Sequence, residues 1–222
     1  MTTTPYELIV LDMAGTTVVD DGLVEGAFAR AWDRIIATDE GRDTALEHVR
    51  ATMGQSKIEV FRAIADEPTA QALNDDFERS LRELIDEGHC VAIAGAEQAI
   101  MTLRELGYKI AFTTGFSSAT ATAILTALGW TELADVVLSP ADAGRGRPAP
   151  DLVLTAVIRT QTSAVAKVVV VGDTESDAQS GRSAGAGLVV GVLTGSRDEA
   201  ALCAAGAQLV LPSVAELVAA LR

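Results

Sequence analysis

The chain has 222 residues, of which 49% are hydrophobic and 22% charged, and its formal net charge at pH 7 is −14. This length allows one sizeable core, or a core with a small second domain, in an ordinary globular protein. The acidic charge argues against nucleic acid as a partner, because phosphate backbones require basic surface. Since no apolar run approaches the about 18 residues of a membrane span, and residues 1–11 lack the features of a signal peptide, we expect a cytoplasmic protein without membrane contact.

The two cysteines agree with a reducing compartment. Cys90 and Cys203 lie far apart in the sequence. We expect two buried thiols rather than a disulfide.

Short apolar runs alternate with helical patterns along most of the chain. The runs predict strands at 7–12, 109–114, 135–139, 167–173, 187–193 and 208–211. The helical patterns cover 94–107, 117–129, 149–160 and 176–185. Continuous Val, Ile and Leu runs are typical of parallel strands that are buried on both faces. The alternation therefore predicts an α/β fold with an open, doubly wound, Rossmann-like sheet.

Residues 19–91 interrupt this alternation. They contain no convincing strand and show helical periodicity, with Gly, Asp, Ser or Pro at the ends of each segment. We therefore predict two domains: an α/β core at 1–18 and 92–222, and an inserted helical domain at 19–91.

Polar residues follow several predicted strands. Asp12 ends the first, Thr113, Thr114 and Gly115 end the second, and Asp173 follows the fourth. Ligands of open parallel sheets bind outside the carboxyl ends of the strands, so we expect these groups to share one crevice. The loop "GRPAP" adds Arg147.

This set of residues suits attack on phosphorus. Asp12 can act as a nucleophile and form an aspartyl phosphate. Mg²⁺ relieves the repulsion between a carboxylate and a phosphoryl group, and it prefers hard oxygen ligands. We expect Asp12, Asp173 and the Ala14 carbonyl to bind it, with Asp177 in support or in contact through water.

Three further groups are candidates for holding the phosphoryl oxygens. The Thr114 hydroxyl and the Gly115 amide can donate hydrogen bonds, although the neighbouring threonines leave the contact uncertain by one residue. Arg147 supplies a fixed positive charge, which stabilises the phosphoryl group more strongly as negative charge develops on it.

Four segments together resemble the motifs of the haloacid dehalogenase (HAD) superfamily. They are "DMAGTT", "TTG", "GRPAPD" and "VGDTESD", in that order and each at a predicted strand end. The resemblance implies a Rossmann-like core with an inserted α-helical cap of the C1 type, which covers the site and selects the substrate.

One position departs from most phosphatases of that superfamily, which carry a second Asp two residues after the nucleophile. Here that residue is Ala14, and such general acid–base help is worth about 10²–10⁴-fold. The phosphonatase (phosphonoacetaldehyde hydrolase) subgroup has the same change, and "TTGF" and "GRPAP" also resemble its motifs. Its cap lysine forms a Schiff base with the substrate aldehyde, so that no alkoxide leaves. The stretch "MGQSKIEV" puts Lys57 at that position, with Met53 beside it as a substrate contact.

Two residues differ from the subgroup. Val60 stands where it has a histidine, and Phe116 where it has a tyrosine. His48 is a possible replacement from a neighbouring helix, although a surface role fits it better, and His89 fits a structural role. Lys57 therefore has three interpretations: Schiff-base chemistry, binding of an anion, or no role.

Three functions remain open from the sequence. The first is Mg²⁺-dependent cleavage of the P–C bond of phosphonoacetaldehyde or a related small phosphonate. The alternative is hydrolysis of a small phosphate monoester without the usual Asp acid. A receiver-type phosphoacceptor fits least, since such domains have about 120 residues and no inserted helices. Apolar residues of the predicted cap (Phe28, Trp32, Phe61) face either the core or the cap of a partner, so a homodimer through the cap is possible.

Overall fold

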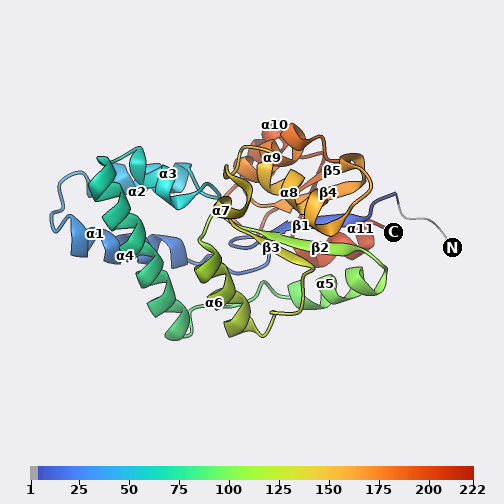
Figure 1. The fold of residues 1–222 in the computed structure, drawn as a ribbon, viewed down its shortest axis with the longest axis horizontal. Coiled ribbons are helices and arrows are strands. Elements are labelled where there is room, and N and C mark those ends of the chain that lie inside the picture. Colours follow the sequence, from blue (N-terminus) through green and yellow to red (C-terminus); the bar gives the residue numbers. More distant parts are fainter. Residues whose placement is uncertain (1–4) are drawn as a thin grey trace.

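The computed structural model describes residues 5–222 and has a six-stranded parallel sheet at its centre. Its spatial order is β3-β2-β1-β4-β5-β6 (Figure 1). The strands are β1 (Leu8–Asp12), β2 (Lys109–Thr113), β3 (Val136–Leu138), β4 (Val168–Gly172), β5 (Leu188–Val192) and β6 (Leu209–Leu211). Every strand that the sequence predicts is present, and the α/β fold class is confirmed.

Side chains of each strand alternate between two covered faces, as strand geometry requires. Ile9 and Leu11 of β1 belong to the larger apolar cluster, with α5 and α6, while Leu8 and Val10 belong to another with α8. The core helices are α5 (Ala96–Glu105), α6 (Ser118–Leu128), α7 (Pro140–Ala143), α8 (Asp151–Thr160), α9 (Glu175–Ala184), α10 (Glu199–Ala205) and α11 (Leu217–Ala220). Helices therefore cover both faces of the sheet.

A helical module lies beyond the carboxyl ends of the strands (Figure 1). It consists of α1 (Leu23–Ile35), α2 (Arg42–Ala51), α3 (Lys57–Arg62) and α4 (Glu67–Asp86). Asp66 caps the start of α4, because its carboxylate accepts a hydrogen bond from the Thr69 amide at 3.1 Å. Inside the module the rings of Phe61 and Phe77 meet with their centroids 5.6 Å apart.

The two chain segments that join the module to the core run side by side. The Val19 amide donates to the Val91 carbonyl at 2.8 Å, and the Ile93 amide donates to the Thr17 carbonyl at 2.9 Å. A β-bridge pairs Val18 with Ala92 between them. This paired connection supports the proposed division of the chain at 18/19 and 91/92.

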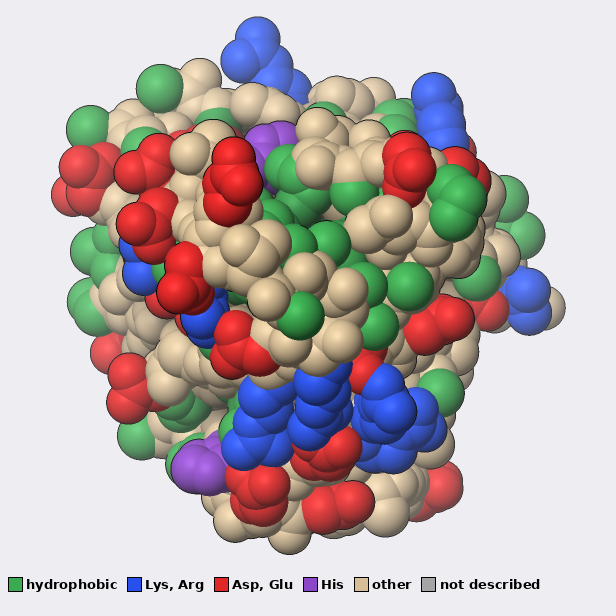
Figure 2. Space-filling view, turned by 90° about the vertical axis from the view of Figure 1, so that its left-hand side faces the viewer, with side chains coloured by type: hydrophobic (Ala, Val, Ile, Leu, Met, Phe, Trp, Pro, Cys, Tyr) green, Lys and Arg blue, Asp and Glu red, His purple; other side chains and the backbone are tan. Residues whose placement is uncertain are grey.

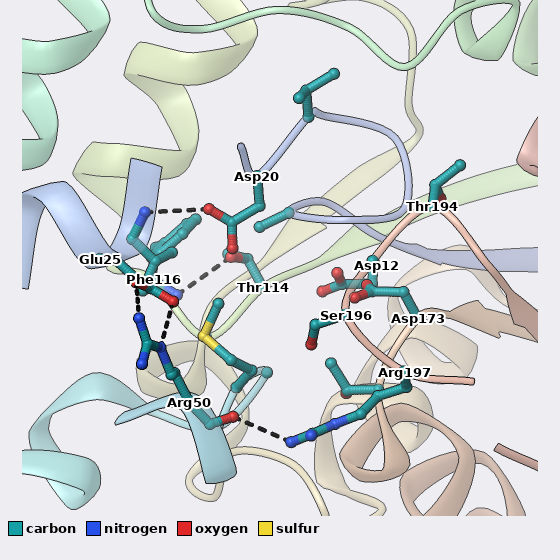
Figure 3. Close-up of a pocket in the computed structure, with 18 of the residues that line it drawn as sticks. Asp12, Asp20, Glu25, Arg50, Thr114, Phe116, Asp173, Thr194, Ser196 and Arg197 are labelled. Atoms are coloured by element: carbon teal, nitrogen blue, oxygen red, sulfur yellow. Dashed lines mark hydrogen bonds and ion pairs between the residues drawn. The ribbon is translucent and has the colours of Figure 1, made fainter. Parts of the chain in front are cut away.

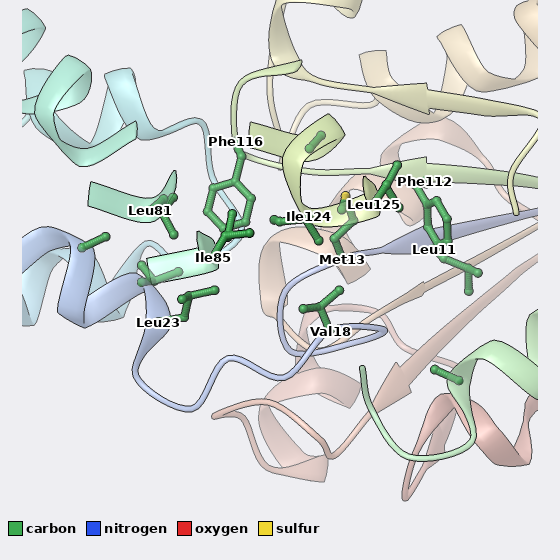
Figure 4. Packing of buried hydrophobic residues seen from close by; sticks show 14 of the residues in the cluster. Leu11, Met13, Val18, Leu23, Leu81, Ile85, Phe112, Phe116, Ile124 and Leu125 are labelled. Carbon is green, nitrogen blue, oxygen red and sulfur yellow. The ribbon is translucent and has the colours of Figure 1, made fainter. Parts of the chain in front are cut away.

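Phe116 packs at the contact between the module and the core. Figure 4 shows its ring beside Leu81 and Ile85 of α4, with Ile124 of α6 on its other side. The apolar cluster of the sheet is continuous with that of the module. Burial of apolar surface therefore stabilises the module against the strand ends.

Several expectations about single residues need correction or restriction. Cys90 and Cys203 are free thiols as expected, but Cys90 is only half-buried and Cys203 is exposed. Phe28, Trp32 and Phe61 are buried within the chain, so they are not available to a partner. A homodimer through the module stays a prediction. Within residues 5–222, no helix has the length and apolar character needed to cross a membrane.

Candidate active site

Three buried carboxylates meet at the carboxyl ends of the central strands. Asp12 is the last residue of β1, Asp173 directly follows β4, and Asp177 lies in the first turn of α9. One oxygen of each lies within 4.8 Å of those of the others, and each residue is at most 4% exposed. Figure 3 shows Asp12 and Asp173 side by side.

The turn after β1 shapes the space around Asp173. Gly15 has a φ of +83°, and a Cβ atom there would collide with the Asp173 carboxylate, so both the backbone and the space require glycine. A Cβ at Gly195 would meet the same group. Thr16 Oγ1 donates to Asp173 Oδ1 at 2.8 Å and fixes the carboxylate.

Arg147 balances part of this negative charge. It is 5% exposed, and its Nη1 lies 2.5 Å from Asp12 Oδ1 and also pairs with Asp177 Oδ1. The other oxygen of Asp177 accepts from Thr174 Oγ1 at 2.5 Å and from the Thr174 amide at 3.1 Å. Asp177 is thus occupied by Arg147 and Thr174, which favours the supporting role among those that the sequence leaves open.

The arrangement fits a divalent cation. Burial, with the nearby charge of Asp12 as a second cause, raises the pKa of Asp173 well above its usual range. Asp12, Asp173 and the carbonyl of Ala14, which lines the same cavity, offer hard oxygen atoms of the kind that Mg²⁺ prefers.

A cavity of about 620 Å³ extends from the carboxylates to the helical module. Thr114 and Gly115 line it from the core, and Met53 and Lys57 line it from the module. Thr113 does not line it, so the structure brings Thr114 to the cavity rather than its neighbour. Thr114 Oγ1 accepts a hydrogen bond from the Phe116 amide at 3.1 Å.

The loop at residues 52–56 brings the module close to the core. A Cβ at Gly54, whose φ is +81°, would collide with Thr174 Oγ1, and a Cβ at Gly115 would collide with the Gln55 carbonyl. The Lys57 amide donates to the Gly115 carbonyl at 3.4 Å. These close approaches place the start of α3 against the predicted phosphoryl contacts.

Lys57 carries its amine into this buried space. The residue is 4% exposed, and its Nζ lies 5.8 Å from the centroid of the Phe116 ring. Burial lowers the pKa of Lys57 to about 8, although Asp20 and Asp12 act in the opposite direction. A lysine with this pKa is still mostly protonated at pH 7, but it holds a far larger share of neutral, nucleophilic amine than an exposed lysine does.

Comparisons with known proteins agree with the geometry. Residues 6–185 match the model of the haloacid dehalogenase-like hydrolases. The chain belongs to this family. It is 30% identical over 212 residues to a phosphonoacetaldehyde hydrolase of Bacillus cereus, with 86% of this chain and 77% of the relative covered. It is 28% identical to that of Parabacteroides distasonis, with 96% and 95% covered. A phosphonoacetaldehyde hydrolase-like protein of Oleispira antarctica has the same fold, with a TM-score of 0.80, 22% identity, and 98% and 91% of the two chains covered.

The two histidines of this HAD-like hydrolase lie away from the site. His48 on α2 is half-buried, and the side chain of His89 is 62% exposed. Neither lines the cavity. Val60 is 2% exposed within the apolar cluster, so no titratable group occupies its position either.

Several residues of the hydrolase's cavity were not singled out from the sequence. Asp20, Arg50 and Arg197 line it, and Arg197 Nη2 donates to the Arg50 carbonyl at 3.0 Å, which joins core and module at the mouth (Figure 3). Asp20 precedes α1, and its Oδ1 accepts from the Val24 amide at 3.1 Å. In the sequence, an Asp four residues before Val24 is typical of an ordinary helix cap. Arg50 and Arg197 belong to no motif, so only the fold shows that these two residues line the cavity.

Proposed function

We propose that this hydrolase is a phosphonatase-like, Mg²⁺-dependent enzyme that cleaves the P–C bond of phosphonoacetaldehyde or a related small phosphonate. One observation carries the proposal. The amine of Lys57 and the carboxylate of Asp12 line the same cavity, while Ala14 stands where a general acid would be. The names of the relatives in Bacillus cereus and Parabacteroides distasonis support the same substrate.

The core residues would receive the phosphonate group. The Thr114 hydroxyl and the Gly115 amide would donate to its oxygens, and Arg147 would hold Asp12 in place and balance charge. Mg²⁺, held by Asp12, Asp173 and the Ala14 carbonyl, would supply the charge that lets a carboxylate approach a dianion. The helical module at 19–91 would act as a cap that closes the cavity over the substrate.

Lys57 would prepare the P–C bond for cleavage. Its neutral amine adds to the aldehyde carbon, and loss of water leaves an iminium ion. An Asp12 oxygen then attacks phosphorus, and the electron pair of the P–C bond moves toward the iminium nitrogen to give an enamine. Since no alkoxide leaves, this reaction needs no general acid at position 14, and an alanine there is compatible with it.

A second function is favoured by a specific observation. Val60 and Phe116, which replace the subgroup's histidine and tyrosine, are both buried in the apolar cluster and offer no proton donor. In this alternative the enzyme hydrolyses a small phosphate monoester whose leaving group needs no protonation, and Lys57 binds an anionic part of the substrate.

Borohydride trapping separates the two functions. We expect phosphonoacetaldehyde with Mg²⁺ to give phosphate and acetaldehyde, and borohydride to inactivate the enzyme and label Lys57. The variant Lys57→Arg should lose both label and turnover, because an arginine forms no imine. Lys167→Arg is the matched control, since Lys167 pairs with Glu7 at the surface and should change nothing. Full P–C cleavage by Lys57→Arg, or phosphate released only from esters, would overturn the first function.

The cellular location and the oligomeric state of the protein are also proposals. A cytoplasmic location is supported by the two free thiols. A homodimer through the helical module would show as a doubled mass in solution.

A further inference from the structure

Asp20 is a cavity carboxylate that the chemistry above does not use. It lies in the segment between the turn after β1 and the start of α1, and it is half-buried. It lines the cavity together with Lys57 and Phe116. Figure 3 shows it set apart from the pair formed by Asp12 and Asp173.

The Asp20 carboxylate can still accept a hydrogen bond or a proton from a ligand. Its Oδ1 accepts from the Val24 amide, and among residues 5–222 it forms no ion pair within 4.0 Å. The charged groups that act on it are Lys57, Asp12 and Glu25. Glu25 is itself paired with Arg50 at 2.6 Å. Within the described residues, the carboxylate is therefore positioned by one backbone donor, and the charge of Lys57 in the same cavity acts on it.

The imine steps need a proton donor and acceptor near Lys57, and few groups qualify. Neither histidine lines the cavity, and position 60 is apolar. Asp12, Asp173 and Asp177 serve the phosphoryl site, and Asp21 is exposed at the rim. Glu25 is held by Arg50. Glu78 also acts on Lys57, but it does not line this cavity and already accepts hydrogen bonds from Ser117 and Thr120. Among the described residues, Asp20 remains as the carboxyl group inside the cavity.

We propose that Asp20 is the acid–base residue for making and breaking the Lys57 imine, a role that rests on the phosphonatase-like function. The protonated carboxyl group gives its proton to the hydroxyl of the carbinolamine; the C–O bond breaks, water leaves, and the nitrogen lone pair completes the C=N bond. After P–C cleavage the enamine carbon takes a proton from water, and the hydroxide left behind is neutralised by the proton that hydrolysis of the Asp12 aspartyl phosphate releases. A second water adds to the product iminium, and the Asp20 carboxylate takes the proton that this water loses. The C–N bond of the resulting carbinolamine then breaks as a proton passes from its oxygen to its nitrogen, which releases acetaldehyde and the neutral Lys57 amine and leaves Asp20 protonated as at the start.

The environment of Asp20 suits this exchange. Burial raises its pKa, and the Val24 amide and the charge of Lys57 limit the rise. A raised pKa makes the protonated form of a carboxyl group easier to populate, and this is the form that can give a proton to the leaving hydroxyl.

The test measures the rate of imine formation directly, by mixing enzyme with phosphonoacetaldehyde and quenching with borohydride at successive times. Asp20→Asn retains an oxygen for the Val24 amide and should slow labelling of Lys57 by about 10²-fold or more. Formate should restore part of the rate in Asp20→Ala. Asp21→Asn is the matched control and should label as the wild type does. Stabilisation by Mg²⁺ with inorganic phosphate, read from the unfolding temperature, should be the same in all variants.

Each other result has a distinct meaning. If Asp20→Asn labels at the wild-type rate, Asp20 is not the acid–base residue, and the phosphonatase-like function stands. If the variant also loses stabilisation by Mg²⁺ and phosphate, and formate restores nothing, Asp20 is merely structural and the inference is wrong. If the wild type forms no imine at all, the proposed function fails, and the role of Asp20 fails with it.

Discussion

The charged residues on the outer surface of the helical module and those in the cavity are in opposite electrostatic situations. On the module, Arg30 lies 2.8 Å from Glu87, Arg34 lies 2.8 Å from Glu83, and these hydrogen-bonded pairs lower the pKa of both glutamates. Figure 2 shows such basic and acidic side chains gathered together on this end of the molecule. In the cavity, burial raises the pKa of Asp173 and lowers that of Lys57, so that it disfavours both charged forms.

This difference indicates which region of the protein is suited to hold a ligand. The surface charges of the module are satisfied by one another and by water. The cavity brings together carboxylates and an amine that lack enough partners of opposite charge, which is costly unless a cation, a substrate or both complete the set. Perturbed groups of this kind cluster at functional sites, so the contrast identifies the cavity independently of any motif.

Removal of the proposed nucleophile should have the largest effect on the cavity. Asp12→Asn should lower phosphate release by at least about 10⁴-fold, because an amide oxygen does not form the phospho-intermediate. Asp33→Asn is the matched change on the module, where Asp33 pairs with Arg42 at the surface. It should leave kcat/KM within about twofold of the wild type. Comparable losses in the two variants would mean that Asp12 is not the nucleophile.

Metal binding should relieve the repulsion between the buried carboxylates. We expect Mg²⁺ to raise the free energy of unfolding, by about 2.7 kcal/mol when the ion is present at 100 times its Kd. Asp173→Asn should abolish this gain, and chelation should reverse it in the wild type. Urea unfolding with and without Mg²⁺ measures the effect without reference to activity. An equal gain in Asp173→Asn would place the ion elsewhere.

Lys57 allows the cost of a buried charge to be measured. Lys57→Met should stabilise the fold at pH 7 by about 1–3 kcal/mol, because the wild type buries a cation there. The folded pKa of about 8 lies below the ordinary lysine value of 10.5, so wild-type stability rises as pH increases between these values. The advantage of Lys57→Met should therefore be full below pH 8 and fade toward pH 10.5. An advantage that is the same at every pH would show that packing, and not charge, causes it.

The strands and the clustering of the carboxylates were predictable from sequence, because a buried strand has a local apolar signal and the ends of parallel strands meet. Apolar runs such as "KVVVVGD" identify buried strands, and the carboxyl ends of parallel strands meet at one edge, so Asp12 and Asp173 had to lie close together. The short helices α7, α10 and α11 lack enough periodicity to be recognised. The exposure of Cys203 was misjudged because residue type says little about one position on an amphipathic helix.

The cavity wall that the module contributes was less predictable. Lys57 was found only through its resemblance to a known motif, and Asp20 was not found at all. Which module residues reach the core depends on how α3 and the loop at 52–56 dock, and that docking rests on close approaches at Gly54 and Gly115. Such contacts join segments that are far apart in the chain, so no periodic pattern in the sequence indicates them.

The smallest effect that we predict concerns the surface of the module. Arg30→Ala removes two ion pairs, with Glu83 and Glu87, yet the unfolding temperature should fall by no more than about 2 °C, because water and salt screen exposed pairs. Added salt should shrink even this difference, whereas it should leave the effect of Lys57→Met nearly unchanged, since a buried charge is poorly screened. Thermal unfolding of both variants at low and high salt measures this. If Arg30→Ala lowered the unfolding temperature by more than Lys57→Met changes it, and salt did not alter that loss, the contrast would be wrong. The outer charges would then contribute more to stability than the charge in the cavity does.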